Sequence, residues 1–165
     1  MFSDSRFVII AGTARNVGKT TLACRIIKQN SSKNIIALKF VTLKEGGQIH
    51  SHHSDVKTYS IIEETNLKSS KDTVKMLKSG AKKAYLIVSK EEFVEKALSE
   101  FIRLLDNDDF VIVESATLRN YIIPRKFIIV DREGAVNKKE YIKALVPLAD
   151  ILVKDVFSDL SITVL

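Results

Sequence analysis

Short apolar runs alternate with amphipathic stretches along most of the chain. The apolar runs are continuous, rich in β-branched residues and bounded by turn residues, which predicts buried strands. These predicted strands span residues 7–11, 34–40, 59–62, 84–88, 110–113, 127–130 and 151–153. Apolar residues at helical spacing predict helices over residues 20–29, 72–78, 90–105 and 137–148.

The order of these elements predicts the fold class. Strands that alternate with helices form βαβ units, and continuous apolarity indicates strands covered on both faces. The sequence therefore predicts one α/β domain over residues 1–165, a three-layer fold whose mostly parallel sheet carries helices on both faces. Functional residues are expected in the loops at the carboxyl ends of the strands.

The segment between the first predicted strand and the first predicted helix carries the most specific chemical signal. It reads Gly12-Thr13-Ala14-Arg15-Asn16-Val17-Gly18-Lys19-Thr20-Thr21. Glycines let a tight turn direct its N–H groups at phosphate oxygens, the lysine ammonium reaches the β- and γ-phosphates, and the following hydroxyl ligates Mg²⁺. We therefore predict a P-loop that binds a nucleoside triphosphate and Mg²⁺, with Lys19 as a catalytic cation and Thr20 as a metal ligand.

The predicted loop departs from the common P-loop pattern at one position. In that pattern four residues separate the first glycine from the Gly-Lys pair. Thr13 occupies this position here, and Gly12 precedes it. Either the loop is one residue longer than usual or it does without the first glycine.

Two further charged residues end predicted strands. Glu114 follows the apolar run 110–113 directly, so it belongs beside the P-loop if the two strands are neighbours. Mg²⁺ prefers hard oxygen ligands with one or two carboxylates nearby, which makes Glu114 a candidate metal-side group. Lys39 ends the second strand and either points its charge at the same edge or lies in solvent.

Composition and charge limit the other classes of function. The chain has 45% hydrophobic and 28% charged residues, which is typical of a soluble globular protein. Its single cysteine excludes a disulfide framework and a Cys-rich zinc site. No apolar run is long enough to cross a membrane, and the polar start of the chain is unlike a signal peptide, so a cytoplasmic protein is expected.

The net charge of +6 is concentrated in the first third of the chain. Residues 1–60 contain nine Lys or Arg and three Asp or Glu, a difference of 9 − 3 = +6. A basic region of this kind predicts a polyanionic partner or a solvated surface. Nucleic acid is disfavoured, because no dense Lys/Arg block with interleaved aromatic residues is present.

Several segments resemble known nucleotide-binding proteins. The pattern Gly-Thr-x-x-x-Val-Gly-Lys-Thr is similar to the P-loop of dethiobiotin synthetase and the cobyrinic acid amide synthases, in the SIMIBI branch of P-loop proteins. The rest of the chain resembles MobB-like proteins, which are linked to molybdopterin guanine dinucleotide synthesis. The shared features are Leu38-Lys39 before a His-rich loop, Ser70-Lys71-Asp72-Thr73 before a short helix, and 110–115 followed by Pro124.

This resemblance implies a function and roles for several residues. A MobB-like protein would bind GTP, hydrolyse it slowly and assist a protein partner in cofactor biosynthesis, and it is compatible with a homodimer. A dethiobiotin synthetase-like protein would be an ATP-dependent small-molecule kinase or ligase. In the related synthetases, residues placed like Glu114 and Lys39 contact the metal and the phosphate or substrate anion. A basic nucleic-acid-binding module is the third alternative.

The second metal-side carboxylate has two candidates. Relatives of the synthetase type carry a metal-binding Asp after the second strand, where Asp55 stands here. Asp72 is the other candidate, although it also fits a helix-capping role. The loop that contains Asp55 also carries His50, His52 and His53, which either bind a metal such as zinc or nickel or belong to a polar loop. No guanine-reading motif is evident, since residues 137–140 (Asn-Lys-Lys-Glu) end in Glu after the wrong spacing.

Overall fold

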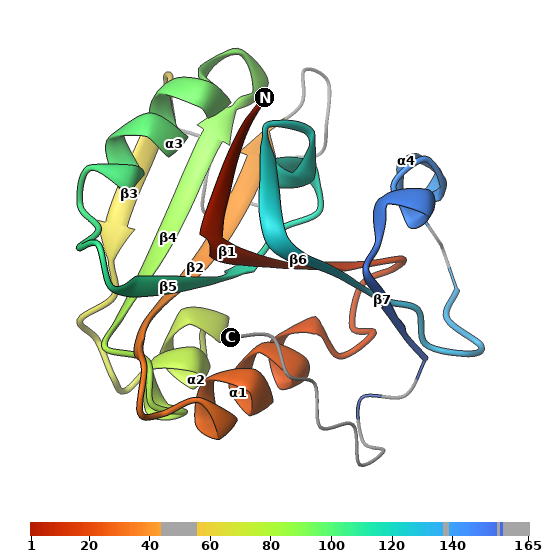
Figure 1. The fold of residues 1–165 in the computed structure, drawn as a ribbon, viewed down its shortest axis with the longest axis horizontal. Helices are drawn as coiled ribbons and strands as arrows, with labels where there is room; N and C mark the ends of the chain where they lie inside the picture. The colour runs from red at the N-terminus through yellow and green to blue at the C-terminus, as the bar shows by residue number, and fades with distance from the viewer. Residues whose placement is uncertain (44–55, 137–138, 155, 157–165) are drawn as a thin grey trace.

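The chain folds around a single seven-stranded sheet flanked by helices (Figure 1). The computed structural model describes residues 1–43, 56–136, 139–154 and 156. The strands are β1 (Phe2–Gly12), β2 (Asn34–Leu43), β3 (Tyr59–Glu63), β4 (Lys83–Lys90), β5 (Asp109–Glu114), β6 (Ile122–Val130) and β7 (Ile151–Val153). The helices are α1 (Lys19–Gln29), α2 (Asp72–Lys78), α3 (Val94–Ile102) and α4 (Glu140–Lys143), with short 3-10 turns η1 (Glu91–Phe93), η2 (Thr117–Asn120) and η3 (Val146–Leu148).

The sheet has the strand order β3-β4-β2-β5-β1-β6-β7. All neighbouring strands run parallel except β3, which pairs with β4 in the antiparallel sense. Because β5 lies between β1 and β2, the ends of these three strands meet at one edge of the sheet. The predicted α/β class with a mostly parallel sheet is confirmed.

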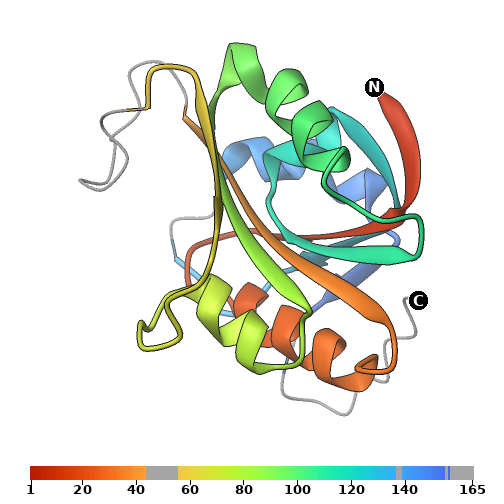
Figure 2. The same cartoon turned by 90° about the vertical axis from the view of Figure 1, so that its left-hand side faces the viewer.

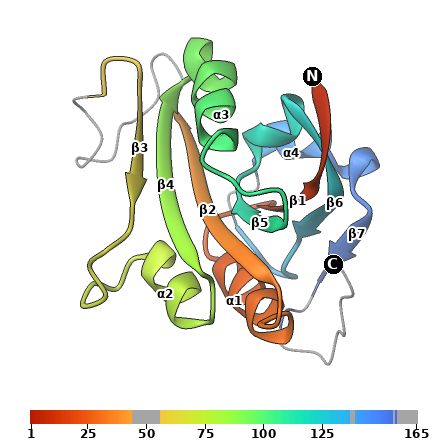
Figure 3. The same ribbon diagram turned by 60° about the vertical axis from the view of Figure 1, so that its left-hand side comes forward.

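Helices lie on both faces of the sheet (Figures 2 and 3), and each face buries its own apolar core. One core lies under α1 and α2 and includes Ile10, Ile26 and Ile112. The other lies under α3 and includes Phe7, Phe101 and Phe127. Successive side chains along a strand point to opposite faces of the sheet. Because both faces are covered here, both sets of side chains on the central strands must be apolar. This accounts for the continuous apolar runs in the sequence.

Several boundaries differ from the predicted ones. The helix predicted over 137–148 is wrong, because α4 covers only Glu140–Lys143 and η3 follows as a separate 3-10 turn that contains Pro147. Proline cannot continue a helix hydrogen-bond ladder. The helix predicted over 90–105 is also shorter, since its first turn is η1 and α3 ends at Ile102.

The neighbouring strands β1 and β6 are longer than predicted. β1 begins at Phe2 and β6 at Ile122, and they pair along their first residues before their register shifts between Asp4 and Val8. Both strands turn sharply at this point (Figure 1). Apart from the buried Ile122, most of these first residues are polar or exposed, so the pairing left no long apolar run in the sequence.

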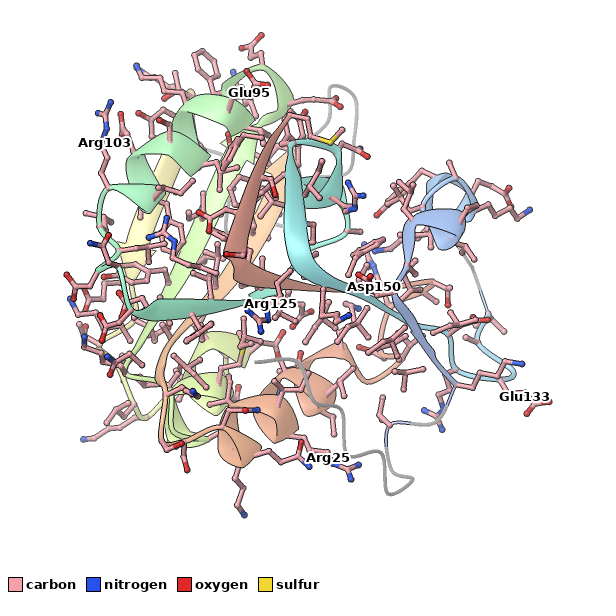
Figure 4. All side chains as sticks on the ribbon, viewed as in Figure 1. Arg25, Glu95, Arg103, Arg125, Glu133 and Asp150 are labelled. Carbon is pink, nitrogen blue, oxygen red and sulfur yellow. The ribbon has the colours of Figure 1, made fainter. Side chains whose placement is uncertain are left out.

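The last strand is held to its neighbour by a reciprocal pair of hydrogen bonds. The backbone N–H of Phe127 donates to Asp150 Oδ2 at 2.7 Å, and the N–H of Asp150 donates to the Phe127 carbonyl at 2.9 Å. Asp150 lies where the chain enters β7 beside β6 (Figure 4). This contact fixes the end of the sheet next to the segment that follows β6.

Candidate functional site

Gly12 ends β1 at a position where no side chain fits. A Cβ there would lie 2.7 Å from Val17 Cγ2 and 2.8 Å from Lys19 Cδ, closer than real contacts of this kind. The backbone can therefore pass directly beneath the Lys19 side chain only because residue 12 is glycine. The close approach to Lys19 is thus made at Gly12. A glycine is therefore required at position 12 and not at position 13, where the common pattern has one.

The turn from β1 into α1 uses left-handed backbone conformations. Asn16 has φ 56° and Gly18 has φ 103°. The helix begins after Gly18, whose carbonyl accepts the N–H of Leu22 at 2.9 Å, and no side chain caps this end. The first N–H groups of a helix have no acceptor within the helix, and they carry partial positive charge. The start of α1 therefore offers donors and a positive potential to an anion.

Lys19 extends back over the loop. Its ammonium donates to the Ala14 carbonyl at 3.3 Å, across the turn. Burial is the main reason that the pKa of Lys19 lies below its usual value, and the nearby Glu114 carboxylate opposes this effect. A partly buried ammonium with one neutral acceptor favours a further anionic partner.

Thr20 and Glu114 form the hydrogen bond that joins α1 to β5. The Thr20 hydroxyl donates to Glu114 Oε2 at 2.7 Å. Glu114 is 8% exposed and lies beside Ile10 of β1 in the register of the two parallel strands. The predicted proximity of Glu114 to the loop is therefore confirmed. These two hard oxygen donors fit the ligand preference of Mg²⁺.

Lys39 lies on the same face of the sheet as Glu114. The two residues are register partners on β2 and β5, and partners in register point their side chains to the same face. The Lys39 ammonium forms an ion pair with Asp72 at the start of α2. The Lys39 side chain therefore lies on the same face as Glu114 and is held by Asp72, so it does not simply extend into solvent.

Asp72 is connected to the site by its ion pair with Lys39. Its second oxygen accepts from Lys75 at 3.0 Å. Burial acts to raise the pKa of Asp72, but the hydrogen bonds from Lys39 and Lys75 outweigh it, so the pKa lies below the usual value. The N-cap position of α2 belongs to Lys71, which makes no side-chain cap. The other candidate carboxylate, Asp55, and the three histidines at 50, 52 and 53 lie outside the described residues.

Two residues near the loop were missed by the sequence predictions. Asp131, directly after β6, accepts the Thr13 hydroxyl at 2.7 Å. The backbone N–H of Lys139 donates to the Thr13 carbonyl at 2.7 Å. The rule that singled out Glu114, a carboxylate directly after a buried strand, would also have found Asp131. Lys139 carried no such signal, because it belonged to a predicted helix that does not form.

Two other polar groupings lie apart from the Thr20–Glu114 contact, which is on the α1 face of the sheet. A cavity of about 250 Å³ lies between η1, η2 and α4 on the α3 face, and its polar lining includes Glu91, Asn120 and Tyr121. A close set of carboxylates, Asp106, Asp108 and Asp109, lies at the opposite end of β5 from Glu114. Neither offers cations to a phosphate.

Comparison of the chain with protein-family models, curated proteins and solved structures gave no match. No helix within the described parts of the chain is long and apolar enough to cross a membrane.

Proposed function

We propose that this chain is a Mg²⁺-dependent P-loop protein that binds a nucleoside triphosphate, ATP or GTP. The observation that carries the proposal is the 2.7 Å hydrogen bond from Thr20 to Glu114, next to Lys19, at the ends of two adjacent parallel strands. A helix start, a lysine, a hydroxyl and a carboxylate converge at one edge of the sheet. This combination matches the needs of a phosphate chain that carries a metal ion.

Each group has a defined part in this proposal. The N–H groups at the start of α1 bind phosphate oxygens, and Lys19 exchanges the Ala14 carbonyl for a phosphate. Thr20 and Glu114 would hold Mg²⁺, directly or through water, and the ion would supply neutralisation of the negative charge on the terminal phosphates. Lys39, held by Asp72, adds a further positive charge on the same face.

Hydrolysis is proposed to be slow. Within the described residues, the carboxylates near the loop already accept hydrogen bonds, Glu114 from Thr20 and Asp72 from Lys39 and Lys75. Asp131 likewise accepts from Thr13, so each described carboxylate near the loop is oriented by a neighbouring side chain. Positioning of the attacking water is a principal contribution in phosphoryl transfer, and these contacts do not supply it. A slow NTPase fits the MobB-like role, in which the protein assists a partner in molybdopterin-type cofactor biosynthesis.

The 250 Å³ cavity supports a second candidate function. It lies beside η2, which follows β5 closely, so a small acceptor molecule could bind at the same edge of the sheet as the phosphates. This favours an ATP-dependent small-molecule kinase or ligase. Nucleotide turnover that rises at least about tenfold with one acceptor from a panel of carboxylates and alcohols would select this candidate.

The direct test of the proposed function is a binding comparison by calorimetry. ATP and GTP are titrated into the full chain, each with Mg²⁺ and with EDTA, and turnover is followed by phosphate release. We expect micromolar or tighter binding of one nucleotide with Mg²⁺, weaker binding with EDTA, and turnover well below about 1 s⁻¹. Absence of binding under all four conditions would overturn the proposal.

A further inference from the structure

The ion pair between Lys39 and Asp72 lies on the same face of the sheet as the proposed phosphate site. Lys39 and Glu114 are register partners on the neighbouring strands β2 and β5, and α2 packs against β2 on this face (Figure 3). Neighbouring strands are about 4.8 Å apart, a distance that an extended lysine side chain exceeds. Because Glu114 accepts from Thr20, the Lys39 ammonium can reach a phosphate bound at the Thr20–Glu114 contact.

The pair that holds Lys39 is open to solvent. The side chains of Lys39 and Asp72 are 31% and 25% exposed. An ion pair of this exposure contributes little free energy, because water screens the charges and both side chains lose freedom. A charge-assisted hydrogen bond from an ammonium to a phosphate is stronger, and terminal phosphates carry several negative charges. Lys39 therefore has more to gain from a phosphate than from Asp72.

Asp72 keeps a partner if Lys39 leaves. The carboxylate has two oxygens with separate partners, and Oδ1 accepts from the Lys75 ammonium at 3.0 Å within the same helix. A partly buried carboxylate with no remaining cation would oppose the departure of Lys39. Lys75 removes this obstacle, so the pair can open without leaving an unpaired charge.

We propose that Lys39 exchanges Asp72 for a phosphate when the nucleotide binds, so that Asp72 lowers nucleotide affinity and the start of α2 is released from β2 on binding. This inference rests on the proposed function and adds regulation of the same site. Asp72 is a positioning residue here, because it acts only through Lys39. Linkage is reciprocal, so a cation that binds Asp72 in place of Lys39 would raise the affinity for nucleotide.

The test is a double-mutant cycle of Asp72→Asn and Lys39→Met, with Glu64→Gln as the matched control. Each substitution keeps the approximate size of the side chain and removes its charge. Glu64 accepts the Thr73 hydroxyl of α2 at 3.0 Å and lies 3.7 Å from the Lys71 ammonium. Glu64→Gln therefore removes a carboxylate charge beside the start of α2 and leaves the Lys39–Asp72 pair intact.

The readout is the calorimetric affinity of the full chain for AMPPNP and GMPPNP with Mg²⁺. Asp72→Asn should bind about twofold to fivefold more tightly, which corresponds to the loss of a partly exposed ion pair. Lys39→Met should lose about tenfold, because a charged contact to phosphate disappears. In the Lys39→Met background, Asp72→Asn should give less than about half of its gain in binding free energy. Glu64→Gln should match the wild type.

A second substitution guards against a folding defect. Asp72→Ser repeats the comparison with a residue that suits the start of a helix. It should show the same gain in affinity as Asp72→Asn. Melting temperatures identify the variants that are folded, and only these enter the cycle.

Each other outcome overturns a distinct statement. If the wild type binds triphosphates and Asp72→Asn binds them equally or more weakly, the exchange is wrong while the proposed function stands. An equal gain in both backgrounds, or in Glu64→Gln, would show simple charge repulsion and would also overturn the exchange. If the wild type binds no nucleotide, both the exchange and the proposed function fail.

Discussion

Gly12 shows how a single missing side chain shapes the loop. Its backbone lies under the Lys19 stem and beside Val17, at distances that leave no room for a methyl group. The unusual spacing between this glycine and the Gly-Lys pair is therefore accommodated by a longer turn. The left-handed conformations of Asn16 and Gly18 provide that turn.

Gly12→Ala should destabilise the protein by about 1–3 kcal/mol, because an inserted methyl overpacks a close contact. Urea unfolding of the full chain measures this loss. Gly134→Ala is the control, since nothing lies within 4 Å of the Gly134 Cβ position, although its φ of 71° is one that side chains disfavour. Gly134→Ala should cost only about 1 kcal/mol from backbone strain. Equal losses in the two variants would contradict the steric account of Gly12.

Glu114→Gln should reduce the contribution of Mg²⁺ to nucleotide affinity. Glutamine keeps the size of the side chain and can still accept from Thr20, but it removes the negative charge near the metal. We expect the ratio of affinities with Mg²⁺ and with EDTA to fall by about tenfold, equivalent to roughly 1.4 kcal/mol. Glu95→Gln, on the exposed side of α3, should leave the ratio unchanged (Figure 4). A ratio equal to that of the wild type would contradict the proposal that Glu114 helps to hold Mg²⁺.

At the scale of elements, α2 is tied to the edge of the sheet by charge as well as by apolar packing. Met76 is buried in the core shared with α1, while Asp72 at the helix start pairs with Lys39 of β2. The ion pair places Lys39 on the site face and gives Asp72 a depressed pKa. The start of α2 therefore becomes less stable when this carboxylate is protonated.

The lowered pKa of Asp72 determines how the stability of the Asp72→Asn variant should change with pH. A carboxyl with a folded-state pKa below its ordinary value of 3.8 contributes stability above that value, and the contribution is lost as the pH falls through the folded-state pKa. Asp72→Asn should therefore be destabilised by about 1 kcal/mol or less at pH 7 and match the wild type near pH 2. Urea unfolding at both pH values measures the difference. A deficit of the same size at pH 2 would contradict the ion-pair explanation.

At the scale of the whole molecule, three strand ends and the segment after β6 meet around one loop. β5 lies between β1 and β2, which brings Glu114 next to both the loop and Lys39. Asp131 and Lys139 complete this edge from the carboxyl side of β6. The site is thus made by residues more than a hundred positions apart in the chain.

Much of this arrangement was predictable because it follows local rules. Continuous apolar runs marked the buried strands, and parallel strands place a following carboxylate such as Glu114 at a shared edge. The contact between Lys139 and Thr13 was not predictable in this way. It depends on how a short segment, interrupted by proline, folds back onto the loop. Neither the hydrophobic periodicity nor the spacing of motifs predicts this contact.

The Lys39–Asp72 pair illustrates the same limit within the site. Each residue was a candidate for contact with phosphate or metal, but their pairing joins a residue within β2 to the start of a helix thirty-three positions away. Only the packing of α2 against the sheet brings them together. Sequence position alone therefore placed both residues at the correct edge without showing that they neutralise each other.

The most direct measurement is calorimetry of Mg²⁺-nucleotide binding to Lys19→Ala beside Lys28→Ala. Lys19 lies over the loop, whereas Lys28 is exposed at the other end of the same helix. Lys19→Ala should lose at least about a hundredfold in affinity while its melting temperature stays within a few degrees, because a charged contact to phosphate disappears. Lys28→Ala should bind like the wild type. Unchanged affinity in Lys19→Ala would contradict the assignment of this loop as a phosphate-binding site.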